Sequence, residues 1–430
     1  MMAVTGMVVR ADFFIAPGVQ RLAQVTDNNS PAAKAIQAAQ KFIADRNVKG
    51  ARESLQGLST DPNIVHPEVL LAELLTEAGF DNDARVLLEE LSGKEPARMD
   101  LYLAFCERAV RQQRWFEGWN LADVGLKSKV PEYWSPTFRQ YVADRLWLLK
   151  AVCCEGRKDW KGAQQLYLGI KRSEKNELDV LAGLGRVSFH LGETNSAIEY
   201  FEILKKLKPK SDHPYLFLAQ LNDLVGNLAE AEASYQQAMQ KAEEGEVTRV
   251  RLAFARWLIV HNRPEGTLPL LKDPIVDSAD NETERLYLQG LVARMEGRFG
   301  EAQELFSTLH RQDPSKFVVG NQLAIVLCES ADESLRARSL QLAEGNVRSH
   351  SQSSEAWATL GWVQFRLGDS ISAERSYANS AQLGPMSRDT LYYIWQLKQV
   401  AGDLSAAALL EKAFLEARGP NYFVHRQVGK

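Results

Sequence analysis

The chain has 430 residues, of which 45% are hydrophobic and 25% are charged, and its formal net charge is -4. These are ordinary values for a folded chain with a large core, and they argue against disorder and against a membrane span. The near-neutral balance, without a long run of Lys or Arg, also argues against a phosphate-binding surface, so we expect no nucleic-acid partner. Ala and Leu dominate the apolar residues, which favours an all-α fold because unbranched side chains lose little rotamer freedom in helices.

Residues 1–31 are predicted to form an N-terminal arm or cap ahead of the folded array. Their apolar runs, residues 7–9 and 13–16, are short and are separated by Arg10 and Asp12. A signal peptide needs a longer continuous apolar segment. We therefore expect a cytoplasmic protein without a transmembrane segment.

Helix–turn–helix units are predicted from residue 32 onward. In residues 32–132 we expect about three units, whose recurring residues are Ala39, Phe42, Ala51, Leu55, Leu71, Ala72, Gly79, Ala84, Leu88 and Pro96. The stretch 127–138 then carries two prolines and exceeds a normal turn between units, so residues 133–143 are predicted to be an inter-repeat loop. Such an insertion projects from one face of a repeat array, where it can contact a partner.

Residues 144–420 are predicted to hold about eight further units, followed by a tail at 421–430. Three of these units share one spacing of small, aromatic and proline residues. The first copy has Leu184, Gly185, Gly192, Ala197, Phe201 and Pro209, and the second has Gly290, Gly297, Ala302, Phe306 and Pro314. The third and clearest copy has Trp357, Leu360, Gly361, Gly368, Ala373, Tyr377 and Pro385.

This spacing resembles the tetratricopeptide repeat, a helix–turn–helix unit of about 34 residues. The resemblance covers about nine-tenths of the chain in about ten or eleven tandem units, and it implies an all-α, right-handed superhelical solenoid. Small residues such as Gly361 let the two helices of a unit approach closely, and prolines end the second helix. Glycines that follow the first helix suit a left-handed cap; these are Gly192, Gly226, Gly297, Gly368 and Gly402.

No pattern typical of an enzyme occurs in the sequence. A phosphate-cradling Gly-rich loop, a His-Glu-x-x-His helix and a Gly-x-Ser-x-Gly elbow are all absent. The seven histidines are dispersed through different units, and the four cysteines have neither a disulfide-framework nor a metal-ligand spacing. We therefore expect no catalytic activity, no metal and no cofactor.

The resemblance implies a protein–protein interaction scaffold that binds a partner segment in the concave groove lined by the first helices. It places these candidate peptide-binding residues on or near the groove: Arg186, His190, Gln220, Arg256, Tyr287, Arg294, Asn321, Trp362, Arg366, Tyr392 and Tyr393. Arg mixed with aromatic side chains is the composition of peptide hot spots, so Trp362, Tyr392 and Tyr393 are expected to be exposed anchors. The competing interpretation is that the aromatics pack between helices and the arginines pair with acids such as Glu284 and Glu355.

Two other functions fit the same repeat. In one, the array is a regulatory or sensor domain that recognises a small ligand. In the other, it is a non-catalytic subunit of an enzyme or of an envelope-assembly complex. The stretch 127–138 is the alternative to the groove as a binding site. The sequence alone identifies neither the partner nor the oligomeric state.

Overall fold

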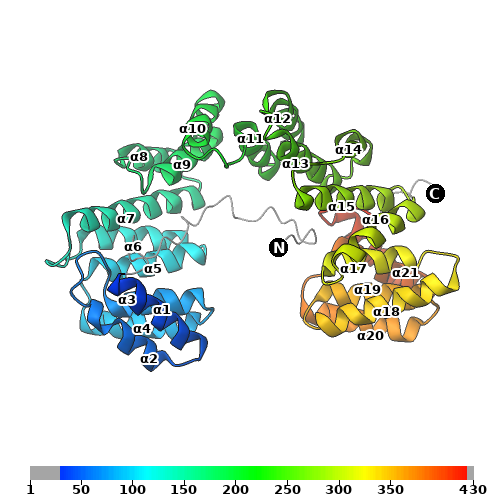
Figure 1. Ribbon diagram of the computed structural model, residues 1–430, viewed down its shortest axis with the longest axis horizontal. Coiled ribbons are helices and arrows are strands. Elements are labelled where there is room, and N and C mark those ends of the chain that lie inside the picture. The colour runs from blue at the N-terminus through cyan, green and yellow to red at the C-terminus, as the bar shows by residue number, and fades with distance from the viewer. Residues whose placement is uncertain (1–29, 424–430) are drawn as a thin grey trace. The chain divides into compact units, whose positions relative to one another are not determined.

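The computed structural model describes residues 30–423 (Figure 1). Within this range the chain forms twenty-two α-helices and one 3-10 turn, and its only β-type contact is an isolated bridge between Arg98 and Lys129. The predicted all-α fold is confirmed. Most of the predicted arm or cap at 1–31 lies outside the described residues. Ser30 caps helix α1 (Pro31–Ala44) by accepting a hydrogen bond from the backbone N–H of Ala33.

The described residues form two compact units, residues 30–234 and 235–423, called here the N-terminal unit and the C-terminal unit. The division falls within α12 (Leu228–Lys241) and not at the predicted loop. The N-terminal unit contains α1, α2 (Val48–Leu55), α3 (Pro67–Glu77), α4 (Asp81–Lys94), α5 (Met99–Arg111), α6 (Trp115–Lys127), α7 (Pro136–Gly156), α8 (Trp160–Gly169), α9 (Glu177–His190), α10 (Thr194–Leu207) and α11 (Pro214–Leu224).

The C-terminal unit contains ten further helices after the end of α12. They are α13 (Val247–Val260), α14 (Pro264–Leu271), α15 (Ala279–Met295), α16 (Phe299–Gln312), α17 (Phe317–Leu327), α18 (Glu333–Ser349), α19 (Ser354–Arg366), α20 (Ser370–Leu383), α21 (Arg388–Val400) and α22 (Leu404–Glu416). Taken in order, the described helices make eleven consecutive pairs, which agrees with the predicted ten or eleven units.

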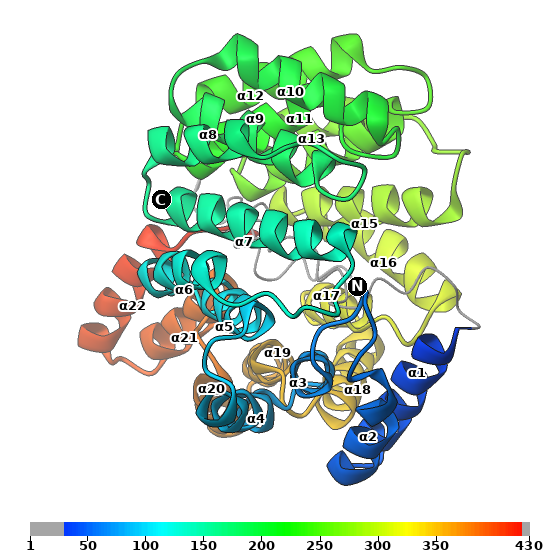
Figure 2. The ribbon, with the colours of Figure 1, turned by 90° about the vertical axis from the view of Figure 1, so that its left-hand side faces the viewer.

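In both the N-terminal and the C-terminal unit, the helices pack in pairs as the predicted repeat requires. The odd-numbered helix of a pair, called here the first helix, lies against the even-numbered second helix, as in α5 with α6 and α19 with α20 (Figures 1 and 2). First helices of neighbouring pairs also contact each other, as α5 does with α7 and α19 does with α21. Such contacts link the first helices from α1 to α11 in the N-terminal unit, and α13 with α15 and α17 with α19 and α21 in the C-terminal unit. Between α15 and α17, Arg294 donates a hydrogen bond to Gln322.

Glycines on the first helices mark the places where the two helices of a pair come closest. A Cβ atom added at Gly185 would lie 2.4 Å from ring carbon Cε1 of Phe201, and one at Gly361 would lie 2.5 Å from Cε1 of Tyr377. Both distances are far below van der Waals contact. The predicted role of these glycines in close helix approach is confirmed.

In most helical pairs, the turn between the two helices contains a residue with positive φ; the turn from α17 to α18 does not. The five glycines predicted as caps adopt it, with φ between 75° at Gly297 and 91° at Gly368. In pairs that lack the glycine, Gln113, Lys158 and Asn262 take the same conformation, with φ of 57°, 60° and 60°. Non-glycine residues pay a steric cost there, so the turn is kept even where the sequence signature is weak.

The predicted loop at 133–143 is wrong in its extent. Helix α7 begins at Pro136, and the connection from α6 covers only residues 128–135. Proline suits the first turn of a helix because the N–H it lacks would have had no partner there. The connection is also anchored, since Trp134 is buried and its indole N–H donates to the carbonyl oxygen of Ile64 at 3.1 Å.

The predicted tail at 421–430 also needs correction where it is described. Asn421, Tyr422 and Phe423 are buried, with 6%, 5% and 2% of their surfaces exposed, and residues 424–430 lie outside the described range. Among the described helices, none combines the length and the apolar character that crossing a membrane requires. The same part of the chain holds no cluster of His, Cys, Asp or Glu suited to a metal ion.

Candidate functional site

The structure buries most of the candidate peptide-binding residues. The expectation that Trp362, Tyr392 and Tyr393 are exposed anchors is wrong, because their exposed fractions are 0%, 3% and 1%. Arg186, Tyr287, Arg294 and Asn321 are buried as well, His190, Gln220 and Arg256 are half-buried, and Arg366 is exposed. The competing interpretation, in which such residues pack between helices, describes these aromatics correctly.

Arg186 belongs to the core of the N-terminal unit. From α9, its guanidinium donates two hydrogen bonds, of 2.8 and 2.9 Å, to the carboxylate of Glu155 on α7. Tyr167 on α8 donates its hydroxyl to the same carboxylate, and all three side chains are buried. Burial alone would lower the pKa of Arg186, but Glu155 more than offsets this and raises it. This ion pair joins consecutive helical pairs and is not available to a partner.

Two further candidates are also engaged within the chain. The His190 ring stacks on Trp160 with 3.9 Å between ring centroids, and burial lowers the pKa of His190. Arg256 on α13 forms an ion pair of 2.7 Å with Glu284 on α15. The ion pair between Arg256 and Glu284 agrees with the competing interpretation, in which the arginines pair with acids such as Glu284.

In the C-terminal unit, the buried candidates face a stretch of the chain that sequence reasoning treated as a tail. Residues 417–423, called here the C-terminal segment, follow α22 and are non-helical. The backbone N–H of Asn421 donates to the side-chain oxygen of Asn262, which follows α13. Arg388 on α21 donates to the carbonyl oxygen of Gly419 at 2.9 Å. The segment thus crosses the surface made by the first helices α13, α15, α17, α19 and α21, called here the first-helix face.

An aromatic cluster holds the end of this segment. The Phe423 ring stacks on Tyr392 at 3.7 Å between centroids with an interplanar angle of 10°. Its edge also meets Trp362 at 6.0 Å and Tyr393 at 5.8 Å. Trp362 in turn stacks on Tyr393 at 4.7 Å. Such offset and edge-to-face pairs add to the stabilisation that apolar burial provides.

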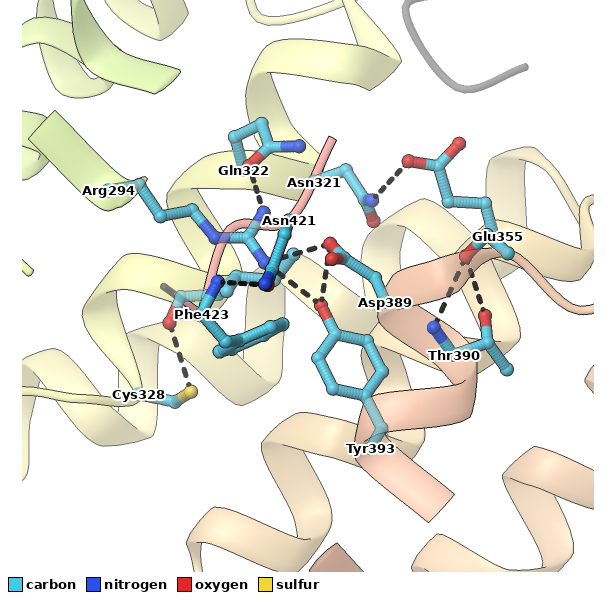
Figure 3. A network of polar contacts seen from close by, with 12 residues as sticks. Arg294, Asn321, Gln322, Cys328, Glu355, Asp389, Thr390, Tyr393, Asn421 and Phe423 are labelled. Carbon is cyan, nitrogen blue, oxygen red and sulfur yellow. Dashed lines mark hydrogen bonds and ion pairs between the residues drawn. The ribbon is translucent and has the colours of Figure 1, made fainter. Parts of the chain in front are cut away.

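Arg294 is the charged centre of the same site (Figure 3). Its side chain on α15 donates to Gln322 on α17 at 2.6 Å and to Asp389 on α21 at 2.8 Å. The guanidinium lies 4.5 Å from the centroid of the Tyr422 ring and 5.2 Å from that of Phe423. Burial alone would lower the pKa of Arg294, but Asp389 more than offsets this and raises it, so Arg294 stays charged. A cation between two aromatic rings and one carboxylate is a cation–π arrangement that desolvation strengthens.

Sequence reasoning missed Asn421, Tyr422 and Phe423. A signal was present, because residues 419–423 read Gly-Pro-Asn-Tyr-Phe. Gly-Pro ends a helix, Asn favours a turn closed by its own side chain, and two adjacent aromatics are unusual in a solvated tail. The structure contains that turn, since the N–H of Phe423 donates to the side-chain oxygen of Asn421 at 3.0 Å.

The N-terminal unit has a pocket of about 420 Å³ between α7, α9 and the connection before α9. Several of its polar groups already have partners. Arg145 donates to Glu107 at 3.0 Å, and Lys175 lies over the ring of Tyr141 at 5.8 Å. Burial raises the pKa of Asp144, which also lines the pocket. The lining therefore presents mixed charges that are largely balanced within the chain.

Comparisons with known proteins bear on the fold alone. No protein-family model and no curated protein matches the chain. Similar solved structures include the APC/C hetero-tetramer Cut9–Hcn1, with 14% identity over 94% of this chain and 85% of that one and a TM-score of 0.36. Yeast Tom70 has 11% identity over 94% and 95% with a TM-score of 0.38. The TPR domain of P58(IPK) has 11% identity over 87% and 99% with a TM-score of 0.27.

These TM-scores are low, so the repeat assignment depends on the structure itself. The paired helices, the successive contacts of first helices, the positive-φ turns and the glycine–aromatic contacts recur along the described residues. The described residues form a tandem array of antiparallel helical pairs, the helix–turn–helix repeat that the sequence spacing predicts.

Proposed function

We propose that this protein is a protein–protein interaction scaffold and that the first-helix face of the C-terminal unit binds a segment of its partner. One observation carries the proposal. That face holds a short non-helical segment, residues 417–423, through side chains on several first helices. Holding such a segment is the task that a peptide-binding repeat array performs.

The chemistry of the contacts supports this proposal. Tyr392, Trp362 and Arg294 supply ring stacking and a buried cation, which are the side-chain types that dominate interface energies. Arg388 and Asn262 bind main-chain groups of the segment, so part of the recognition is independent of side chains. A partner segment would meet both kinds of contact on the same face.

The alternatives have less support. A small-ligand sensor would use the pocket beside α7, where Arg145 and Lys175 already contact groups of the chain. The stretch 127–138 is a weaker candidate for partner binding because Trp134 and Phe138 are buried within the N-terminal unit. A scaffold that belongs to a larger enzyme or assembly complex would be compatible with the same face.

Site-specific photo-crosslinking tests the proposal on the full chain. A photoreactive phenylalanine replaces Arg366, which is exposed on α19 and whose guanidinium lies 5.6 Å from the Trp362 ring centroid. The matched control replaces Arg375, an exposed arginine on α20, the second helix of the same pair. Both proteins are irradiated in extract from the source cells, and the products are identified by mass spectrometry.

We expect a discrete protein partner to crosslink from position 366 and not from position 375. Equal products from both positions, or none from position 366, would contradict the assignment of the first-helix face. Thermal unfolding of each labelled protein shows whether the substitution has left the fold intact.

A further inference from the structure

We propose that the C-terminal segment is an intrachain copy of the partner's binding segment, and that the first-helix face recognises a peptide with two adjacent aromatic residues after an Asn. This inference rests on the proposed function and adds the class of ligand and its regulation. Residues 417–423 occupy the face in the free chain, and the partner binds by displacing them.

The aromatic pair defines the ligand class. Tyr422 lies over the guanidinium of Arg294 at 4.5 Å, and Phe423 stacks on Tyr392 at 3.7 Å, so each ring has its own receptor group. Both rings are almost fully buried, with 5% and 2% exposed. An aliphatic pair could fill the space, but it would lose both the cation–π contact and the ring stacking.

The main chain of the segment sets the register of the two rings. Gly419 has φ of 102°, a conformation that favours glycine, and its carbonyl accepts the hydrogen bond from Arg388. Two residues later, Asn421 donates its N–H to Asn262 and accepts from the N–H of Phe423. Asn421 therefore fixes the turn that aims Tyr422 and Phe423 at the face, and we expect an Asn in the partner segment as well.

The segment can leave without breaking a helical pair. It begins after α22, whose last residue is Glu416, and main-chain groups of Gly419 and Asn421 bond to side chains of Arg388 and Asn262. Its departure would uncover Arg294, Trp362 and Tyr392 together. An aromatic and cationic patch of this kind is a binding surface that either the segment or a partner must cover.

The first experiment uses a labelled synthetic peptide that copies residues 417–423, Ala-Arg-Gly-Pro-Asn-Tyr-Phe, blocked at both ends. Its affinity is measured by fluorescence anisotropy for the full wild-type chain and for the full chain with Tyr422→Ala and Phe423→Ala. We expect the double variant to bind at least about tenfold more tightly than wild type, about 1.4 kcal/mol, because its face is no longer occupied.

Two controls make this comparison specific. The full-chain variant Arg418→Ala changes an exposed residue of the same segment and should bind the peptide like wild type. A peptide that ends in Asn-Ala-Ala should not bind the double variant. A folded double variant that binds the copied peptide no better than wild type would overturn the proposal.

A second measurement on the unmodified chain decides the matter if the double variant does not fold. Hydrogen exchange of residues 417–423 is followed by mass spectrometry with and without saturating peptide. Displacement predicts faster exchange in this segment while α21 stays protected. Unchanged exchange of the segment would refute displacement.

The remaining outcomes separate this inference from the proposed function. A concentration-dependent dimer of the wild-type chain that the double substitution abolishes would assign the face to the segment of a second copy, and would overturn the inference. If the peptide fails to bind while a partner still crosslinks from position 366, the ligand class is wrong and the scaffold function stands. If no partner crosslinks there, the proposed function fails, whatever the peptide does.

Discussion

Replacing Gly361 with Leu should destabilise the C-terminal unit because Gly361 lies where α19 and α20 are closest. An added Cβ would lie 2.5, 2.7 and 3.0 Å from three ring carbons of Tyr377, a side chain with only 4% exposure. The ring would have to shift by roughly 1 Å to regain ordinary contact distances. Overpacking of this size costs about 1–3 kcal/mol, although replacing a helical Gly recovers up to about 1 kcal/mol.

The matched control is Gly345 in α18, where an added Cβ would meet only one atom within 4 Å, the flexible guanidinium end of Arg348 at 3.8 Å. Gly345→Ala should therefore stabilise by up to about 1 kcal/mol. In a unit of roughly 190 residues, each kcal/mol corresponds to a change of about 2–4 °C in Tm. Thermal unfolding followed by far-UV circular dichroism measures both variants. If Gly361→Leu melts with the wild type, the helix contact has been assigned to the wrong residues.

Three further predictions concern the N-terminal unit. Lys158→Gly should raise the free energy of unfolding by up to about 1 kcal/mol, because φ of 60° is strained for Lys. In urea unfolding this appears as a higher midpoint, and an unchanged midpoint would argue against that strain. Arg186→Met should cost about 3–5 kcal/mol in the same assay because it leaves Glu155 buried without its cation, and a cost below about 1 kcal/mol would be inconsistent with a buried pair. Burial lowers the pKa of His66 below its ordinary 6.5, and the Nδ1 of the neutral ring accepts a hydrogen bond from the Glu68 N–H. The neutral form therefore stabilises the fold above pH 6.5, and this contribution is lost as the pH falls through the lowered pKa. His66→Asn should then show a smaller loss of stability between about pH 7.5 and about pH 5.5, and an unchanged loss would locate the sensitive group elsewhere.

The repeat could be predicted from the sequence because it depends on local backbone and packing rules. The spacing between Gly361 and Tyr377 recurs along the chain because in each such helical pair a glycine of the first helix packs against an aromatic ring of the second. Weaker units kept the turn through residues such as Lys158 and Asn262, which carry no distinctive signal. The start of α7 at Pro136 differs from the predicted loop because proline both breaks helices and begins them.

The candidate site could be predicted only in part. Arg294, Trp362, Tyr392 and Tyr393 all contact Phe423 on one face, as the first-helix pattern suggests, but their exposure depends on what covers them. Phe423 and its neighbours in the C-terminal segment cover these side chains. This is a long-range contact, and the period of the repeat does not predict it. Arg294 shows the same limit, because its hydrogen-bond partner Asp389 is 95 residues away in the chain.

The most direct test of the central claim combines the two changes on the first-helix face in one full-length protein. Photo-crosslinking from position 366 is compared with and without Tyr422→Ala and Phe423→Ala, and position 375 serves as the reference. If residues 417–423 compete with the partner, removing their two rings should raise the partner yield from position 366 and leave position 375 unchanged. An unchanged or lower yield from position 366 in a folded protein would contradict the claim that this segment occupies the partner's site.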